Sequence, residues 1–261
     1  MAVDPGKVDG RLAPQQFAGL TYDRFREMAQ DAQLSASEKI GYPDEFRDGY
    51  EPAILADFVA KLPALSRPGA TVLDIGCGCG ELTRMLIAHC RALQQRLLLV
   101  DSAEMLQQLP DDGGALRIAG RFPEQVIEPL RAQVGAGADV IICYGVLHVA
   151  FQDANPFRLL DEAMALLAPG GALLLGDIAN ASKLRRFLAS DAGRAFHKAY
   201  MRTEQEPELP AFAAAGDRID DAVMLGLVQR ARNAGFDAYV LPQPAVLPLS
   251  NRREDLLIAR P

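Results

Sequence analysis

The stretch that decides the fold is TVLDIGCGCGEL, residues Thr71 to Leu82. Its first five residues, TVLDI, predict a buried strand, and residues 81–93 have the apolar spacing of an amphipathic helix. Glycines at positions 76, 78 and 80 let the backbone turn sharply and pass close to a ligand where a Cβ would collide. The free N–H groups at the start of the helix would point into the same crevice. The stretch therefore predicts a ligand-binding turn between a strand and a helix.

From about residue 70 the chain alternates apolar runs with longer amphipathic stretches, as a series of βαβ units does. The apolar runs are nearly continuous, which indicates strands buried on both faces and a mostly parallel sheet. We expect an α/β, Rossmann-like fold with a seven-stranded sheet whose last two strands form an antiparallel hairpin. The predicted strands span residues 71–75, 97–100, 116–119, 138–144, 172–175, 238–241 and 255–259. The predicted helices span 81–93, 103–109, 156–168, where Pro169-Gly170-Gly171 stops the helix, and 220–233.

Two segments flank this body. Residues 1–62 are predicted to form a helical N-terminal cap, with an apolar face at Phe17, Leu20, Phe25 and Met28 and a second helix near residues 52–61. Residues 63–261 form the main domain, with an insertion at about 181–219 that contains the basic segment KLRRF.

A length of 261 residues suits one large α/β domain with a decoration. Hydrophobic residues make up 49% and charged residues 23%, as in ordinary globular proteins. The net charge of −7 argues against nucleic acid or an anionic membrane surface as a partner. The first residues lack an apolar leader, and no window is long and apolar enough to span a bilayer. We expect a cytoplasmic protein that acts on a small molecule, and a homodimer is left open.

Four cysteines, Cys77, Cys79, Cys90 and Cys143, are too few for a disulfide scaffold. With His89 beside Cys90 a metal site can be imagined, but no pair has the spacing of a zinc ribbon or zinc finger. We therefore predict free thiols and no metal.

The glycine loop does not fit the dinucleotide fingerprint G-x-G-x-x-G, because the required third glycine falls on Glu81 or Thr83. The pattern that does occur is G-x-G-x-G, with Asp74 two residues before its first glycine. This pattern resembles the loop of class I S-adenosylmethionine-dependent methyltransferases.

Further segments agree with this resemblance in the same order. Asp101 ends the second strand 21 residues after Gly80, where an acid can accept both ribose hydroxyls of a nucleoside. The run DSAEM, residues 101–105, resembles the ribose-and-adenine segment of the family, in which Met105 would pack on the base. The run AMALLAPGGALLL, residues 163–175, resembles the family's entry to the fifth strand. The resemblance implies S-adenosylmethionine as cofactor, bound by Asp74, Gly76, Cys77, Gly78, Gly80, Asp101, Ser102, Met105, Gly120, Arg121, Phe122 and Tyr144.

Some of these positions have a second interpretation. Asp74 could satisfy the N–H groups of the loop, and Met105 could fill the core. Many family members carry an acid after the third strand that accepts from the adenine amino group, whereas this chain has Arg121, which cannot accept a hydrogen bond. Either the backbone at 120–122 reads the adenine with Phe122 or Arg121 stacked on it, or the base is held in another way.

Three residues are candidates for the catalytic step. His148 follows the fourth strand and has a pKa suited to removing a proton from a hydroxyl or amine. Asp177, at the end of the fifth strand, is a second candidate base, and Tyr144 could face the cofactor or cap the core. Methyl transfer also proceeds by positioning and desolvation without a base, so a structural role for His148 stays open.

Ligands of open α/β folds bind over the carboxyl ends of the strands. The N-terminal helices, the insertion after the fifth strand and the proline-rich turn after Leu241 are able to cover that edge. Aromatic and cationic residues of these helices are candidates to hold a polar or anionic substrate, against the alternative of solvated helix faces. They are Tyr22, Arg26, Tyr42, Arg47 and Tyr50.

We expect a methyltransferase that acts on an oxygen or nitrogen atom of a small molecule. The N-terminal pattern resembles that of methyltransferase-like proteins of surface-sugar or secondary-metabolite pathways. A non-catalytic partner or regulator that binds the same cofactor would share every motif, and an open cavity beside the sulfonium position, lined by Tyr144 and His148, would argue against it. An NAD-dependent oxidoreductase would share the fold, but the failed G-x-G-x-x-G spacing argues against it.

Overall fold

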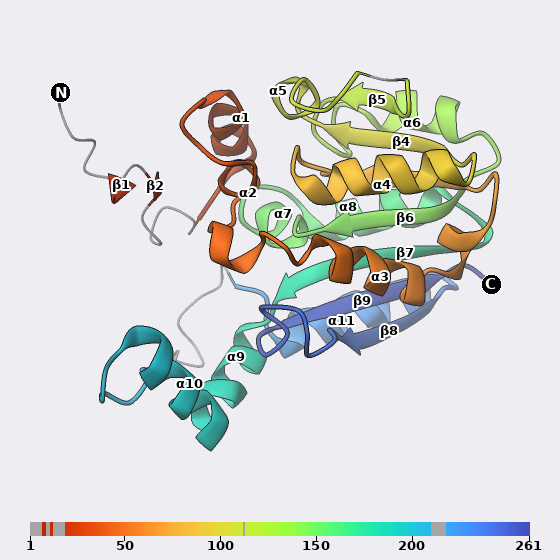
Figure 1. The fold of residues 1–261 in the computed structure, drawn as a ribbon. Helices are drawn as coiled ribbons and strands as arrows, with labels where there is room; N and C mark the ends of the chain where they lie inside the picture. Colours follow the sequence, from red (N-terminus) through yellow and green to blue (C-terminus); the bar gives the residue numbers. More distant parts are fainter. Residues whose placement is uncertain (1–6, 9–10, 13–18, 112, 210–217) are drawn as a thin grey trace.

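The computed structural model describes residues 7–8, 11–12, 19–111, 113–209 and 218–261. In this part of the chain, seven strands form one mixed sheet (Figure 1). Their spatial order is β5 (Leu116–Ala119), β4 (Arg96–Asp101), β3 (Thr71–Ile75), β6 (Ala138–Tyr144), β7 (Leu167–Ala179), β9 (Arg253–Ala259) and β8 (Asp237–Pro242). The first five are parallel, and β9 is antiparallel to both of its neighbours. The predicted fold class is confirmed.

Helices cover both faces of the sheet (Figure 1). The helices of the described chain are α1 (Tyr22–Gln30), α2 (Ala36–Lys39), α3 (Glu51–Lys61), α4 (Glu81–Ala92), α5 (Ala103–Leu106), α6 (Ile127–Val134), α7 (Leu147–Asp153), α8 (Pro156–Ala165), α9 (Ala181–Ala189), α10 (Asp191–Met201) and α11 (Asp221–Asn233). Short 3-10 turns occur at Asp44–Phe46 and Pro63–Ser66.

Alternation along β3 places its side chains in two cores. Leu73 and Ile75 pack with α6, α8 and α11 on one face, and Val72 packs with α3, α4 and α5 on the other. Since α3 contributes Ile54 and Phe58 to the same core as α4, it is fixed to the sheet. The division into a cap of residues 1–62 and a domain of residues 63–261 stays a prediction.

Three expectations for local structure need correction. The helix from Pro156 ends at Ala165 instead of running to Pro169, because Leu167 already pairs with Ala138 at the start of β7. Residues 169–171 lie within that strand beside an irregularity in its register. Helices α6 and α7 were not expected from the sequence, and α5 is shorter than predicted.

The N-terminal segment is helical only in part. Lys7–Val8 and Arg11–Leu12 form an antiparallel pair, β1 and β2, where a helix was expected. The sequence between them is Asp-Gly, which is a hairpin signal that the helical interpretation overlooked. Residues 1–6, 9–10 and 13–18, which include Phe17, lie outside the described residues, while the second predicted helix is present as α3.

The expected insertion contains α9, which carries the basic segment, and α10, while residues 210–217 lie outside the described part. Among the helices of the described residues, none has the length and apolar character needed to cross a membrane.

Candidate functional site

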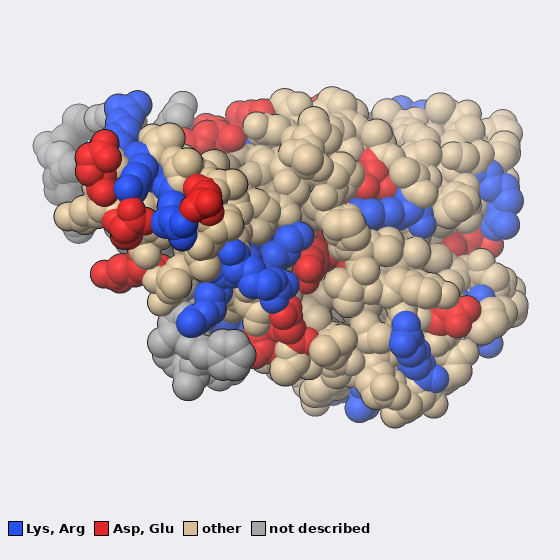
Figure 2. Space-filling view, turned by 90° about the horizontal axis from the view of Figure 1, so that it is seen from below, with Lys and Arg blue, Asp and Glu red and all other residues tan. Residues whose placement is uncertain are grey.

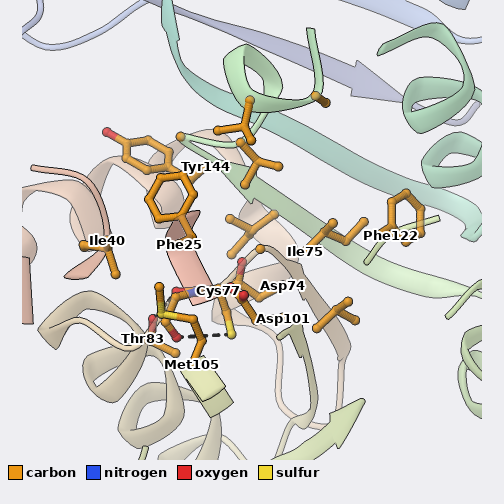
Figure 3. Close-up of a pocket in the computed structure, with 18 of the residues that line it drawn as sticks. Phe25, Ile40, Asp74, Ile75, Cys77, Thr83, Asp101, Met105, Phe122 and Tyr144 are labelled. Atoms are coloured by element: carbon orange, nitrogen blue, oxygen red, sulfur yellow. Dashed lines mark hydrogen bonds between the residues drawn. The ribbon is translucent and has the colours of Figure 1, made fainter. Parts of the chain in front are cut away.

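A cavity lies at the carboxyl ends of β3, β4 and β6, where the strand order reverses between β3 and β6 (Figure 3). Open α/β sheets bind ligands at this switch point. The cavity holds about 1070 Å³ of empty space, counted out to its open mouth. We call it the first cavity. Ten of the twelve residues expected to bind the cofactor line it: Asp74, Gly76, Cys77, Gly78, Asp101, Met105, Gly120, Arg121, Phe122 and Tyr144.

The glycine loop forms the floor of the first cavity. Gly76 and Gly78 have φ angles of 71° and 64°, a region that favours glycine. A Cβ on Gly76 would stand 2.4 Å from Cγ2 of Val146, so this backbone approaches its neighbours more closely than any other residue would allow. The loop is held to the sheet by the N–H of Gly76, which donates to the carbonyl of Val100 at 2.8 Å.

Two acids, the buried Asp74 and the half-buried Asp101, stand beside this loop (Figure 3). The oxygens Oδ2 and Oδ1 of Asp101 accept the N–H groups of Gly78 and Ser102, each at 2.7 Å. Each oxygen keeps a further acceptor site for a ligand hydroxyl. Burial raises the pKa of Asp101 to about 6. Burial, followed by the nearby Asp101, raises the pKa of Asp74 to about 8. A cationic ligand would favour the ionised forms of both, so this cavity fits a positively charged nucleoside.

The remaining wall near Asp101 is apolar. Met105 is 2% exposed and Phe122 8% exposed, and both line the first cavity. These side chains offer a surface for a flat base, while Gly120 donates its N–H to the carbonyl of Asp101 at 2.9 Å. The acceptor oxygens of Asp101 and this apolar surface together fit a nucleoside with a ribose and a base.

Arg121 closes this end of the cavity. Its guanidinium donates to the carbonyl of Asp153 at 2.7 Å and to that residue's carboxylate, and it lies 5.6 Å from the ring centre of Tyr22. The backbone N–H of Tyr22 donates to Asp153 Oδ2 at 3.1 Å. Arg121 therefore joins the loop after β5 to α7 and to the start of α1.

Two of the expected cofactor residues lie outside the lining. Gly80 caps the N-terminus of α4, and a Cβ there would stand 2.9 Å from Cδ1 of Ile40. Ser102 is buried and caps α5 by accepting the N–H of Met105 at 3.2 Å. Gly80 shapes the turn between β3 and α4, and Ser102 shapes the turn between β4 and α5. Both turns carry residues that line the cavity.

The three expected catalytic residues occupy different places. Tyr144 lines the first cavity and packs edge-on against Phe58, with ring centres 5.0 Å apart. Asp177 lines neither of the two cavities described here, because it is 4% exposed and accepts a hydrogen bond from the hydroxyl of Tyr42. Its φ of 55° lies within a register shift of β7, a strained backbone for a residue other than glycine.

A buried polar network surrounds Asp177. Gln243 donates to Asp177 Oδ1 at 3.2 Å and to Asp255 Oδ1 at 3.1 Å. Burial acts to raise the pKa of Asp177, but Arg253, the hydroxyl of Tyr42 and Arg47 outweigh it, and the pKa is lowered. Asp177 therefore stays ionised and acts on Tyr42 instead of facing either cavity.

His148 lies on α7 and lines a second cavity beside the first. Phe25, Ile40 and Tyr42 line both, so they form a shared wall. The Nδ1 atom of His148 is buried and has no hydrogen-bond partner. Burial, followed by Arg253, lowers the pKa of His148 to about 4, so the imidazole is neutral at pH 7. The described lining of the second cavity is Gly19, Leu20, Phe25, Ile40, Gly41, Tyr42, His148, Phe151, Gln152, Ala179, Asn180, Ala181, Leu184, Arg218, Ile219, Arg252 and Arg253.

The structure separates the five residues expected to hold a substrate. Tyr22, Tyr42 and Arg47 line the first cavity, and the guanidinium of Arg47 lies 4.9 Å from the ring centre of Tyr42. Arg26 lies outside both linings and forms an ion pair with Glu104, with Nη2 2.7 Å from Oε1. Tyr50 also lies outside both linings and packs at the start of α3.

Several lining residues were not expected from the sequence. Phe25 and Ile40 cross over the glycine loop from the N-terminal segment. The sequence predicted the apolar face that includes Phe25, but not that Phe25 would line the first cavity. Arg253, in the lining of the second cavity, and Gln243, in the buried network around Asp177, have no local pattern that marks them.

All four cysteines are free thiols. The side chains of Cys77 and Cys143 lie close to the acid pair, and burial raises the pKa of both. Within the described residues, no group of three or more His, Cys, Asp or Glu side chains is arranged to hold a metal ion.

Known proteins are similar to this chain in sequence. A curated relative, the ubiquinone biosynthesis O-methyltransferase of Xylella fastidiosa (strain M23), is 34% identical over 126 residues, which are 47% of this chain and 46% of that protein. The protein of the same name from Xanthomonas campestris pv. campestris (strain B100) is 31% identical over 123 residues, 47% of this chain and 48% of that protein. The chain thus spans about half the length of these relatives.

Solved structures share the fold. The plantazolicin methyltransferase BamL, solved with a triazolic desmethylPZN analog and SAH, superposes with a TM-score of 0.57 at 15% identity, covering 90% of this chain and 97% of that one. An O-methyltransferase family protein from Burkholderia thailandensis gives a TM-score of 0.51 at 19% identity, covering 92% of this chain and 62% of that one.

The family model described as a methyltransferase domain matches residues 44–212, which include the glycine loop, Asp101, Tyr144 and Asp177. The chain therefore belongs to the methyltransferase-domain family, and its resemblance to class I S-adenosylmethionine-dependent methyltransferases is confirmed.

Proposed function

We propose that this enzyme transfers the methyl group of S-adenosylmethionine to an oxygen or nitrogen atom of a small-molecule acceptor, such as a sugar or secondary metabolite. The observation that carries the proposal is the pair of acids, the buried Asp74 and the half-buried Asp101, beside the glycine loop of a cavity that shares a wall with a second cavity. The two relatives named above are O-methyltransferases, which favours oxygen as the acceptor atom.

The first cavity has a group suited to each part of the cofactor. Asp101 would accept the ribose hydroxyls, and Met105 and Phe122 would pack on the adenine. The carboxylate of Asp74 would attract the positively charged amino group of S-adenosylmethionine. Arg47, whose buried Nε has no hydrogen-bond partner, offers a donor to the carboxylate. When bound, S-adenosylmethionine supplies an electrophilic methyl group attached to a positively charged sulfur.

The second cavity would hold the acceptor. The two cavities share Phe25, Ile40 and Tyr42, so an acceptor in the second cavity would lie next to the first. His148 lines this cavity as a neutral imidazole, and we assign it the removal of the acceptor's proton. Asp177 would position the hydroxyl of Tyr42 from behind. The expected single cavity lined by both Tyr144 and His148 is not what the structure has, because Tyr144 lines the first cavity and His148 the second.

Titration calorimetry with S-adenosylmethionine, S-adenosylhomocysteine and NAD tests the cofactor. We expect the two sulfur nucleosides to bind at micromolar concentration and NAD to show no binding. Asp101→Asn should weaken the binding of both by about 10- to 100-fold, because one charge-assisted hydrogen bond contributes about 1.5–3 kcal/mol.

A matched control is Asp139→Asn. Asp139 also accepts a backbone N–H across the sheet, that of Thr71 at 2.8 Å, but it lies at the opposite ends of the strands. This variant should bind the cofactor as the parent does. Equal affinity of the Asp101 and Asp139 variants, or binding of NAD alone, would contradict the proposal.

A further inference from the structure

The second cavity is basic, although the chain as a whole carries a net charge of −7. Its described lining contains Arg218, Arg252 and Arg253 together with His148, and neither Asp nor Glu. A cavity wall of one charge sign raises the local concentration of ligands of the opposite sign.

Arg253, in the lining of this cavity, has an N–H donor that makes no hydrogen bond. Its Nε is buried without a hydrogen-bond partner, and it lies 3.9 Å from Asp177 Oδ1, beyond hydrogen-bond distance. One Nη of Arg253 donates to the carbonyl of Asp177 at 3.2 Å. The nearest acid is already engaged, because Asp177 accepts from Tyr42 and from Gln243. The Nε therefore has an ion-pair partner in Asp177 but no hydrogen bond, and a hydrogen bond to a ligand or to water would offset the cost of its burial.

Arg252 adjoins Arg253 without an acid to neutralise it among the contacts described. Its Nε donates to the amide oxygen of Asn251 at 3.1 Å, and its guanidinium lies 5.8 Å from the ring centre of Phe196. Burial, followed by the charge of Arg253, lowers the pKa of Arg252. Arg218 is exposed at the same cavity.

Two basic side chains near the cavity, Arg186 and Lys198, are paired with acids. On α9 and α10, Arg186 contacts Asp221, and Nζ of Lys198 lies 2.6 Å from Oε1 of Glu206. Basic and acidic side chains stand next to one another on the lower face of the molecule (Figure 2). The acids closest to the cavity wall are also engaged, since Oε2 of Glu254 accepts from Asn180 at 2.6 Å.

We propose that the methyl acceptor carries an anionic group, a carboxylate or a phosphate, which binds Arg252 and Arg253 in the second cavity with Arg218 beside it. The proposal rests on the proposed function, because it assigns the second cavity to the acceptor. The shared wall with Tyr42 faces the first cavity, so the atom to be methylated lies at that end and the anionic group at the arginine end.

The test measures binding of inorganic phosphate, and in a second arm acetate, to the full chain loaded with S-adenosylhomocysteine. We expect saturable binding of at least one anion at millimolar concentration. Arg252→Gln and Arg218→Gln should each weaken that binding at least fivefold. The arm that binds more tightly tells whether the acceptor carries a phosphate or a carboxylate.

Arg158→Gln is the matched control, because Arg158 is exposed on α8 and is not part of the described lining of the second cavity. It removes the same charge and should leave anion binding unchanged. Absence of saturable binding of both anions, or an equal loss in all three variants, would overturn the proposal.

Binding of S-adenosylhomocysteine separates this inference from the proposed function. If the nucleoside binds and the anions do not, the anionic acceptor is wrong and the proposed function stands. If the nucleoside fails to bind while the anions bind with the expected dependence on Arg252, the cofactor assignment is wrong and the anion site stands. Retained nucleoside affinity in Arg252→Gln also shows that this variant is folded.

Discussion

A Cβ built on Gly78 would stand 2.7 Å from Cγ2 of Ile40, so the residue that ends α2 lies directly over the glycine loop. The same side chain approaches Gly80, where a Cβ would lie 2.9 Å from its Cδ1. The N-terminal segment and the loop therefore fit together because these two positions lack side chains.

Gly78→Ala should destabilise the protein for two reasons. A left-handed backbone costs a residue other than glycine about 1–2 kcal/mol, and the new methyl group would also meet Ile40. Gly69→Ala is the control, since Gly69 has a φ of 73° but open space around it. Urea unfolding should show a larger loss for Gly78→Ala, and calorimetry should show weaker cofactor binding in that variant alone.

Ile40→Ala tests the contact directly. In the Gly78→Ala background it should recover the part of the loss that comes from the contact, with a coupling of about 1 kcal/mol in a double-mutant cycle. If the losses in unfolding free energy of the two substitutions simply add, the side chain of Ile40 moves aside without an energetic penalty. The close contact with Gly78 would then contribute nothing to stability.

The pH dependence of stability should reveal Asp74. Burial raises the pKa of Asp74 to about 8 and that of Asp101 to about 6, both above their ordinary value of 3.8. The folded state therefore binds these protons more tightly than the unfolded state does. The protonated acids contribute fully to the free energy of unfolding below pH 4. This contribution is lost as the pH rises through 6 for Asp101 and through 8 for Asp74.

Asp74→Asn removes the upper of these titrations. The free energy of unfolding of the variant, relative to the parent, should be higher at pH 8.5 than at pH 5 by at least about 1 kcal/mol, given 1.36 kcal/mol per unit of pKa shift. Urea unfolding without cofactor at the two pH values measures this difference. Asp191→Asn, at a carboxylate that is 97% exposed, should show no such difference. If the difference in unfolding free energy between Asp74→Asn and the parent is the same at both pH values, ionisation of Asp74 does not destabilise the folded state.

The sequence predicted the parts of the site that follow one another along the chain. TVLDI, the glycines and α4 are neighbours, and each has a local signal in its apolar run, its glycines or its helical spacing. Asp101 could be added because the carboxyl ends of parallel strands meet at one edge. The seven strands followed from apolar runs in the same way.

The residues that cover the site could not be predicted, because their contacts join distant positions. The hydroxyl of Tyr42 meets Asp177, which lies 135 residues further on. Arg26 has the charge expected of a residue that binds an anionic substrate, but its guanidinium forms an ion pair with Glu104. His148 follows the expected strand, yet α7 turns it toward the second cavity. Such outcomes depend on packing that no local pattern records.

Lys61 should be important for stability. Its Nζ lies 2.6 Å from Asp57 Oδ2 and 2.7 Å from Asp255 Oδ2, and Asp255 is completely buried. Lys61→Met leaves a buried carboxylate without its cation, so we expect a loss of about 3–5 kcal/mol in urea unfolding. Burial already raises the pKa of Asp255, and removing the ammonium would raise it further, so the loss should shrink when the pH is lowered to 5.

Arg131→Met gives the comparison for Lys61. Arg131 is 47% exposed and pairs with Glu128 and Glu162 on the surface, where such pairs contribute about 0–1 kcal/mol. Equal losses in the two variants would show that burial adds nothing to the Lys61 pairs.

The titration of His148 can be followed before any acceptor is known. Burial, followed by Arg253, lowers its pKa to about 4, so NMR should show a neutral ring from pH 5.5 to 8. His148→Gln identifies its signals among those of the three histidines in the chain.

Arg253→Gln should raise the pKa of His148 because it removes a nearby positive charge. An anion bound in the second cavity should act in the same direction by screening Arg253, which would make the imidazole a stronger base when an anionic acceptor is present. A titration of His148 near 6.5 in the parent, unchanged by Arg253→Gln, would contradict both the burial of the ring and its electrostatic link to the arginine wall.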